Sequence, residues 1–149
     1  MSSTTPIKSK QRPANLGLLL REPVRIGNAR IAARLAERGH PDVRPPHGNV
    51  FQFLDEGGTR VSVLAERAAI SKQSMAELVA HLEGHGYVER VPDPSDRRAK
   101  LVRSTPRGSE VYEIAREVVV EMEVEWTRRV GARRMRELRA TLERLNENL

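Results

Sequence analysis

Residues 61–108 read VSVLAERAAISKQSMAELVAHLEGHGYVERVPDPSDRRAKLVRSTPRG, and this stretch decides the fold. Its first half predicts two short helices separated by a tight turn, with Thr59, just before the stretch, as N-cap of the first and Ser71 as N-cap of the second. The apolar inward faces are Val61, Leu64, Ala65 and Ala68 in the first helix and Met75, Leu78, Val79 and Leu82 in the second. The other face of the second helix is polar, with Lys72, Gln73, Ser74, Glu77 and His81. This pattern predicts a helix-turn-helix whose second helix enters the major groove of DNA.

The rest of the stretch has the two-residue period of a β-hairpin. Apolar and polar residues alternate in 87–91 and again in 100–103, and the prolines and aspartates of 92–96 favour a turn between them. From Asp96 to Arg107 five cations stand against one acid, which gives a net charge of +4 in twelve residues. A basic hairpin directly after a recognition helix is typical of a wing, which lies along phosphates and inserts arginine into the minor groove.

Helices on both sides of this stretch are predicted to form a dimerisation region. Residues 15–38 suggest a helix interrupted or kinked near Pro23, followed by a proline-rich loop at 39–48 and a short apolar helix. Downstream, Thr105 and Pro106 begin a long helix, Gly131 breaks it, and a heptad seam follows. A winged-helix lobe is compact, so these long helices can bury little of their apolar surface against it. We therefore expect self-association through Leu16, Leu19, Leu20, Val118, Met122, Trp126, Met135, Leu138, Leu142 and Leu145.

Length and composition fit one domain with an appendage. The chain has 149 residues, a net charge of +6 and only 3% aromatic residues, so its own core is modest and a partner subunit would supply further burial. Residues 1–13 are expected to be a flexible basic arm, and residues 14–149 a single domain. The absence of cysteine excludes disulfides, thiolate metal ligands and thiol nucleophiles. With no signal peptide or membrane span in the sequence, we expect a cytoplasmic protein.

Four motifs in this sequence resemble the MarR family of bacterial winged-helix transcription regulators. They are LAER at 64–67, SKQS at 71–74, LEGHGYVER at 82–90 and DPSDRRAK at 93–100, the last followed by STPRG at 104–108. Ser104 is a departure, because the family usually has leucine there. The resemblance implies a mainly α fold with a small β-hairpin wing, in which residues 46–107 form the DNA-binding lobe and residues 14–45 and 108–149 the dimerisation helices. It also implies a homodimer, a palindromic operator and release by a small phenolic or anionic ligand.

The leading hypothesis is therefore a dimeric, sequence-specific DNA-binding repressor. Ser71, Lys72, Gln73 and Ser74 are expected to meet base edges and phosphates at the N-terminal end of the recognition helix. Arg98 matches the arginine of the family's Asp-x-Arg wing motif and is expected to enter the minor groove beside Arg97 and Lys100. In the family the ligand pocket lies between the dimerisation helices and the lobe. The candidate ligand-binding residues there are Arg25, His40, His47 and Phe51.

Two other classes of function were weighed against this hypothesis. One is a winged-helix module that contacts protein without sequence-specific DNA binding. An enzyme is disfavoured, because the sequence has no glycine-rich phosphate loop, no nucleophile elbow and no partnered constellation of carboxylates or histidines. His81 and His85 have the four-residue spacing of two metal ligands on a helix, but no cysteine completes a site. We expect neither a cofactor nor a metal.

Overall fold

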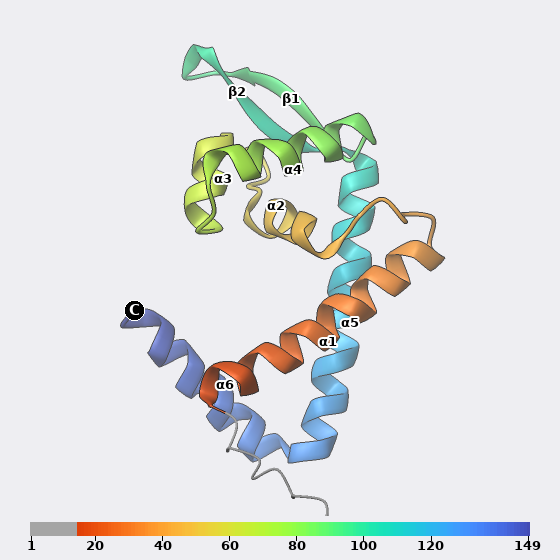
Figure 1. Cartoon of the computed structure of the whole chain (residues 1–149), viewed down its shortest axis with the longest axis vertical. Coiled ribbons are helices and arrows are strands. Elements are labelled where there is room, and N and C mark those ends of the chain that lie inside the picture. Colours follow the sequence, from red (N-terminus) through yellow and green to blue (C-terminus); the bar gives the residue numbers. More distant parts are fainter. Residues whose placement is uncertain (1–14) are drawn as a thin grey trace, which may run out of the picture.

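The computed structural model describes residues 15–149, so the basic segment 1–13 lies outside the described residues. Helices predominate, and a single antiparallel β-hairpin completes the fold, which confirms the predicted fold class (Figure 1). None of the helices within 15–149 combines the length and apolar character needed to cross a membrane. The elements are α1 (Leu16–Glu37), the 3₁₀ helix η1 (Pro45–His47), α2 (Gly48–Phe53), α3 (Val61–Arg67), α4 (Lys72–Gly84), β1 (Val88–Asp93), β2 (Asp96–Ser104), α5 (Pro106–Val130) and α6 (Ala132–Glu147).

Helix α1 is continuous through Pro23, so the predicted interruption is wrong. The side chain of Asn15 caps the helix by accepting a hydrogen bond from the N–H of Leu18 at 3.0 Å. Proline removes the hydrogen bond to the carbonyl group four residues earlier. Residues 15–25 are all exposed, so water can reach the carbonyl group that Pro23 leaves without its helical partner.

The lobe formed by α2, α3, α4 and the hairpin packs around an apolar core that also includes Leu35 of α1 and Val111 and Ile114 of α5. Ala69 adopts a φ of 52° in the turn between α3 and α4, and Ser71 then caps α4 as predicted. Thr59 does not cap α3: Arg60 holds that position, and Thr59 instead pairs with Val102 of β2 through two backbone hydrogen bonds of 2.9 Å. Within the lobe, the residues with at most 2% of their surface exposed are Val50, Leu64, Met75, Val79, Leu82, Tyr87, Val88 and Val102.

Helix α5 joins this lobe to α1. Thr105 caps it as predicted, accepting a hydrogen bond from the N–H of Gly108 at 3.2 Å. Val118 and Met122, which the sequence placed in the dimer seam, are only 2% and 4% exposed in the single chain. Met122 lies against Gly27 of α1, and its Cε atom would be 3.0 Å from a Cβ at that glycine. Both residues are therefore part of the intramolecular core, which the periodicity of α5 alone could not reveal.

A ladder of three ion pairs also connects α1 with α5. Its arginines follow one another at four-residue steps along α1, and its glutamates do the same in the opposite direction along α5, so that each rung is one helical turn from the next. The rungs are Arg30–Glu125 at 2.6 Å, Arg34–Glu121 at 2.9 Å and Arg38–Glu117 at 3.5 Å.

Candidate nucleic-acid interface

Helix α4 presents its N-terminal end to solvent. Ser71 Oγ accepts a hydrogen bond from the N–H of Ser74 at 3.0 Å, and the two hydroxyl groups are 2.8 Å apart. All four predicted contact residues, Ser71 to Ser74, are exposed, because the buried stripe of Met75, Val79 and Leu82 turns the opposite face of α4 into the lobe. An exposed helix N-terminus with a cation and hydroxyl groups suits both phosphate oxygens and base edges.

The wing carries five exposed cations, of which Arg90 and Arg103 pair with Glu83 and Glu89. The side chains of Arg97, Arg98 and Lys100 make no ion pair or hydrogen bond with any residue between 15 and 149. Asp96 accepts a hydrogen bond from the backbone N–H of Arg98 at 3.0 Å and so shapes the backbone after the turn. The three unpaired charges of the wing are thus available to an anionic partner.

A buried carboxylate anchors the turn end of the wing. Asp93 is 7% exposed and accepts hydrogen bonds from the N–H and the hydroxyl group of Ser95 at 2.8 and 2.7 Å. Arg60 Nε, from the start of α3, donates to the same carboxylate at 2.7 Å. The Ser95 contacts, followed by the Arg60 contact, lower the pKa of Asp93 to about 2. Sequence reasoning missed Arg60, since nothing in the local pattern indicates that it lies against the hairpin 33 residues later.

Three histidines stack between the proline-rich loop and α4. The ring centroids of His47 and His81 are 4.4 Å apart, and those of His81 and His85 are 4.3 Å apart. His81 Nε2 lies 2.9 Å from the carbonyl oxygen of Asp42, so His81 faces the loop and not the polar side of α4. Burial, and then the nearby His81 and Arg44, lower the pKa of His47 to about 4. Residues 15–149 contain no group of three potential ligands arranged to hold a metal ion.

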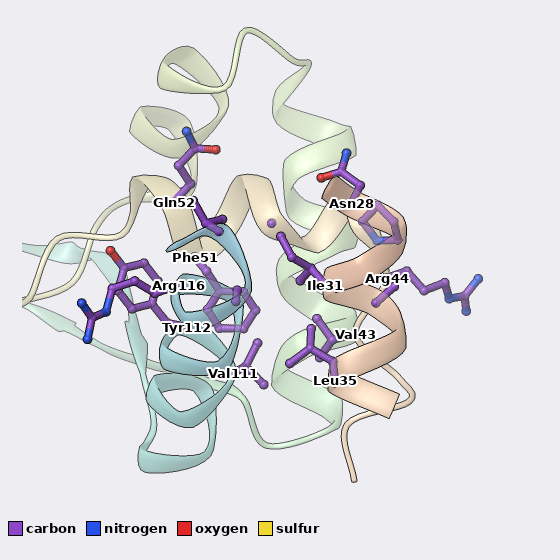
Figure 2. A pocket seen from close by; sticks show the side chains of 15 residues that line it. Asn28, Ile31, Leu35, Val43, Arg44, Phe51, Gln52, Val111, Tyr112 and Arg116 are labelled. Atoms are coloured by element: carbon purple, nitrogen blue, oxygen red, sulfur yellow. The ribbon is translucent and has the colours of Figure 1, made fainter. Parts of the chain in front are cut away.

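A cavity of about 340 Å³ lies where α1, the loop, α2 and α5 meet (Figure 2). Its walls are mainly apolar, and Figure 2 shows these side chains facing one another while the guanidinium groups of Arg44 and Arg116 point outward on opposite sides. Asn28 and Gln52 add amide groups. The apolar lining includes Ile31, Leu35, Val43, Phe51, Val111 and Val119.

The four predicted ligand-binding residues are not brought together. Phe51 lines the cavity, but Arg25, His40 and His47 do not. Arg25 pairs with Glu22 on the exposed side of α1, and His40 is buried with Nδ1 at 3.3 Å from Tyr87 Oη. Sequence periodicity gives no sign of the residues that do form the cavity, because a periodic apolar stripe looks the same whether it faces a neighbour or a void.

The remaining residues predicted at the dimer interface divide into two groups. Leu16 is 63% exposed, Leu19 57% and Leu138 49%, and Leu20 and Leu145 are exposed as well. Trp126, Met135 and Leu142 are half-buried. Helix α6 has no buried residue at all. The first turns of α1 and the length of α6 therefore present apolar side chains that residues 15–149 leave uncovered.

Comparison with known proteins agrees with this architecture. The model of the MarR family matches residues 42–99. The transcriptional regulator HosA of Escherichia coli O127:H6 is 30% identical over 93 residues, which cover 62% of this chain and 69% of HosA. The transcriptional activatory protein BadR of Rhodopseudomonas palustris is 39% identical over 57 residues, covering 38% of this chain and 33% of BadR. The chain spans only 56% of another HosA, from Escherichia coli O111:H-.

Solved structures extend the likeness to nearly the whole chain. A crystal structure of MarR superposes with a TM-score of 0.74 at 25% identity, covering 91% of this chain and 97% of that one. These relatives are regulators of transcription, a class of proteins without enzymatic activity. The fold described above is thus shared with a solved MarR structure over most of the chain. The chain belongs to the MarR family of winged-helix transcriptional regulators.

Proposed function

We propose that this regulator is a homodimeric repressor that binds an inverted-repeat operator and is released by a small ligand. One observation carries the proposal: the exposed N-terminal end of α4 and the three unpaired wing cations belong to the same lobe, and Figure 1 shows α4 and the hairpin on its outer side, away from α6. A polar helix end next to a free basic hairpin matches a major groove and the minor groove beside it.

In this arrangement each part of the lobe has its own role on DNA. Lys72 and the N-terminal amides of α4 contact phosphate, while Gln73 and Ser74 meet base edges. Arg98 enters the minor groove, and Arg97 and Lys100 contact the phosphates on either side. The ion pair of Arg60 with Asp93 fixes the wing against α3, so that these cations approach DNA together with α4.

A second copy of the chain is the proposed occupant of the uncovered apolar surface. Leu16 and Leu19 at the start of α1, and Leu138 and Leu145 on α6, are large apolar side chains that would be costly to leave in water. A two-fold dimer places two recognition helices roughly 34 Å apart, which predicts half-sites centred about 10 base pairs apart.

The cavity supports the ligand part of the proposal. Its apolar walls suit an aromatic ring, and Asn28, Gln52 and Tyr112 supply polar groups for a phenol or a carboxylate. Its walls come from α1 and α5 on one side and from the loop and α2 on the other. A molecule bound there would contact both the dimerisation helices and the lobe, and would shift the lobe relative to its partner.

The test is a fluorescence-anisotropy titration of the protein against the DNA upstream of its own gene and against a scrambled duplex, both at about physiological salt. We expect the upstream DNA to bind at least about 10³-fold more tightly. Equal, weak and salt-sensitive binding to both duplexes, together with no sequence enriched from a random library, would overturn the proposal and favour a protein partner.

A further inference from the structure

The outward ridge of α4 is defined by its buried stripe. Gln73, Glu77, Ala80 and Gly84 follow one another at steps of four, three and four residues, which places them along one face of the helix. All four are exposed, and they lie opposite Met75, Val79 and Leu82. The last two members have little or no side chain. Only Gln73 and Glu77 can therefore reach outward from the middle of this face.

The two polar side chains of the ridge are joined. Gln73 Nε2 donates a hydrogen bond to Glu77 Oε1 at 3.4 Å, one helical turn apart. Glu77 forms no ion pair with any other residue in the described range 15–149, whereas Glu83, the second acid of α4, pairs with Arg90 at 3.1 Å. The carboxylate of Glu77 thus keeps its negative charge unpaired, with one oxygen directed by Gln73 and the other free to accept a hydrogen bond.

An acid at this position restricts what α4 can meet on DNA. A carboxylate is repelled by phosphates and can only accept hydrogen bonds, and the only donors in the major groove are the exocyclic amino groups of cytosine and adenine. We propose that Glu77, positioned by Gln73, reads one such amino group in each half-site of the operator. This inference rests on the proposed function and names one chemical group that the operator must present.

The charge distribution of the lobe supports this assignment. Lys72 and the wing cations provide attraction to phosphate, so one acid at the centre of the ridge lowers affinity for DNA in general without abolishing it. Glu77 then contributes mainly to sequence specificity, because the repulsion between its carboxylate and DNA is offset only where an amino group is present. Ala80 and Gly84 leave room for α4 to approach the base edges that Glu77 contacts.

The experiment begins with selection of duplexes from a random library by the full-length protein, the Glu77→Ala variant and a Glu66→Ala control. Glu66 is also exposed and belongs to α3, so its replacement removes the same charge from the same lobe. We expect the wild-type protein to select an inverted repeat with cytosine or adenine at one symmetric position. Glu77→Ala should lose the preference at that position alone and bind unrelated DNA at least as tightly as the wild type, while Glu66→Ala should keep the motif.

A second experiment removes the exocyclic amino group from the DNA. The selected cytosine is replaced by its pyrimidin-2-one analogue, or the selected adenine by purine, so that the choice of analogue distinguishes the two bases. Wild-type affinity should fall about tenfold per half-site on the analogue, and the affinity of Glu77→Ala should not change. Equal losses for both proteins, or an unchanged motif for Glu77→Ala, would overturn the inference while leaving the proposed function intact. Failure of the wild-type protein to select any motif would overturn both.

Discussion

Arg34 of α1 and Glu121 of α5 form the middle rung of the inter-helix ladder, with Arg34 Nη2 at 2.9 Å from Glu121 Oε2. The hydrogen bond from Arg34 lowers the pKa of Glu121 below its ordinary value near 4.5, and Arg30 does the same to Glu125. These pairs link α5, which continues from the lobe, to α1, whose first turns are exposed. Their contribution to the packing of α1 on α5 can be tested by exchanging charges.

Reversing one charge of the middle rung should lower the melting temperature, and reversing both should restore it. Arg34→Glu places two acids side by side, whereas Arg34→Glu with Glu121→Arg recreates the pair in the opposite sense. The pKa of Glu121 is lowered in the folded state. The ion pair with Arg34 therefore stabilises the fold above about pH 4.5, and this stabilisation is lost as the pH falls through the lowered pKa. Thermal melts at pH 7 and pH 3 measure this. A double variant no more stable than the single one would show that the rung contributes nothing.

Arg98→Ala should weaken operator binding by about 1–3 kcal/mol per site contacted, because a guanidinium in the minor groove is lost. The matched control is Arg136→Ala, which removes the same charge from the side of α6 away from its apolar seam. Anisotropy titrations of the two variants on one duplex make the comparison. If both variants lose affinity equally, the wing has no role beyond net charge.

His47 should make stability depend on pH between about 4 and 6.5. Its pKa is lowered to about 4 in the folded protein from an ordinary value near 6.5, so in this window the unfolded chain binds a proton that the folded chain does not. Stability therefore falls as the pH drops from 6.5 towards 4. His47→Phe keeps a ring against His81 but cannot titrate. The urea midpoint should change less between pH 7 and pH 5 for this variant than for the wild type, and an equal change would place the effect elsewhere.

Gly108→Ala should destabilise the protein by about 1–3 kcal/mol. A Cβ at this position would overlap the carbonyl oxygen of Tyr87 and lie 2.6 Å from Ser104 Oγ, so the first turn of α5 would have to move away from β1. Gly84→Ala is the opposite control, because a Cβ there meets nothing within 4 Å and alanine favours a helix. Urea denaturation should show the two variants shifting in opposite directions.

Leu138→Glu should convert the proposed dimer into a monomer, because it puts a charge into the apolar seam of α6. Ala140→Glu adds the same charge on the opposite side of that helix and should leave the dimer intact. Sedimentation velocity at micromolar concentration distinguishes the two species. A wild-type protein that sediments as a monomer would contradict the proposed dimer directly.

Short-range signals predicted most of the lobe. The N-caps at Ser71 and Thr105, the break at Gly131 and the hairpin around 92–96 were all placed correctly, since each depends on backbone chemistry within a few residues. The same local reasoning gave the exposed face of α4. It failed at Thr59, a good N-cap by type, because a distant strand competes for its backbone groups.

Long-range partners were beyond the reach of sequence periodicity. Val118 and Met122 have the spacing of an interface, and only the path of α1 shows that they are buried inside one chain. His81 likewise stands among polar residues along the chain, yet it packs under a loop 39 residues away. The contact of Arg60 with Asp93 has the same origin. Each of these depends on which elements meet in space, and a single sequence carries no direct signal of that.

The spacing of the ladder has a consequence for how α1 is aligned along α5. Because the rungs repeat every four residues, sliding α1 by one turn, about 6 Å, would exchange partners and still leave two arginines opposite glutamates. Charge attraction therefore permits more than one alignment. Steric fit selects among them, because Met122 lies in the gap at Gly27, and a shift of one turn would bring Pro23 or Ile31 to that place. The missing side chain at Gly27 thus helps to determine how far the winged-helix lobe stands from the exposed start of α1.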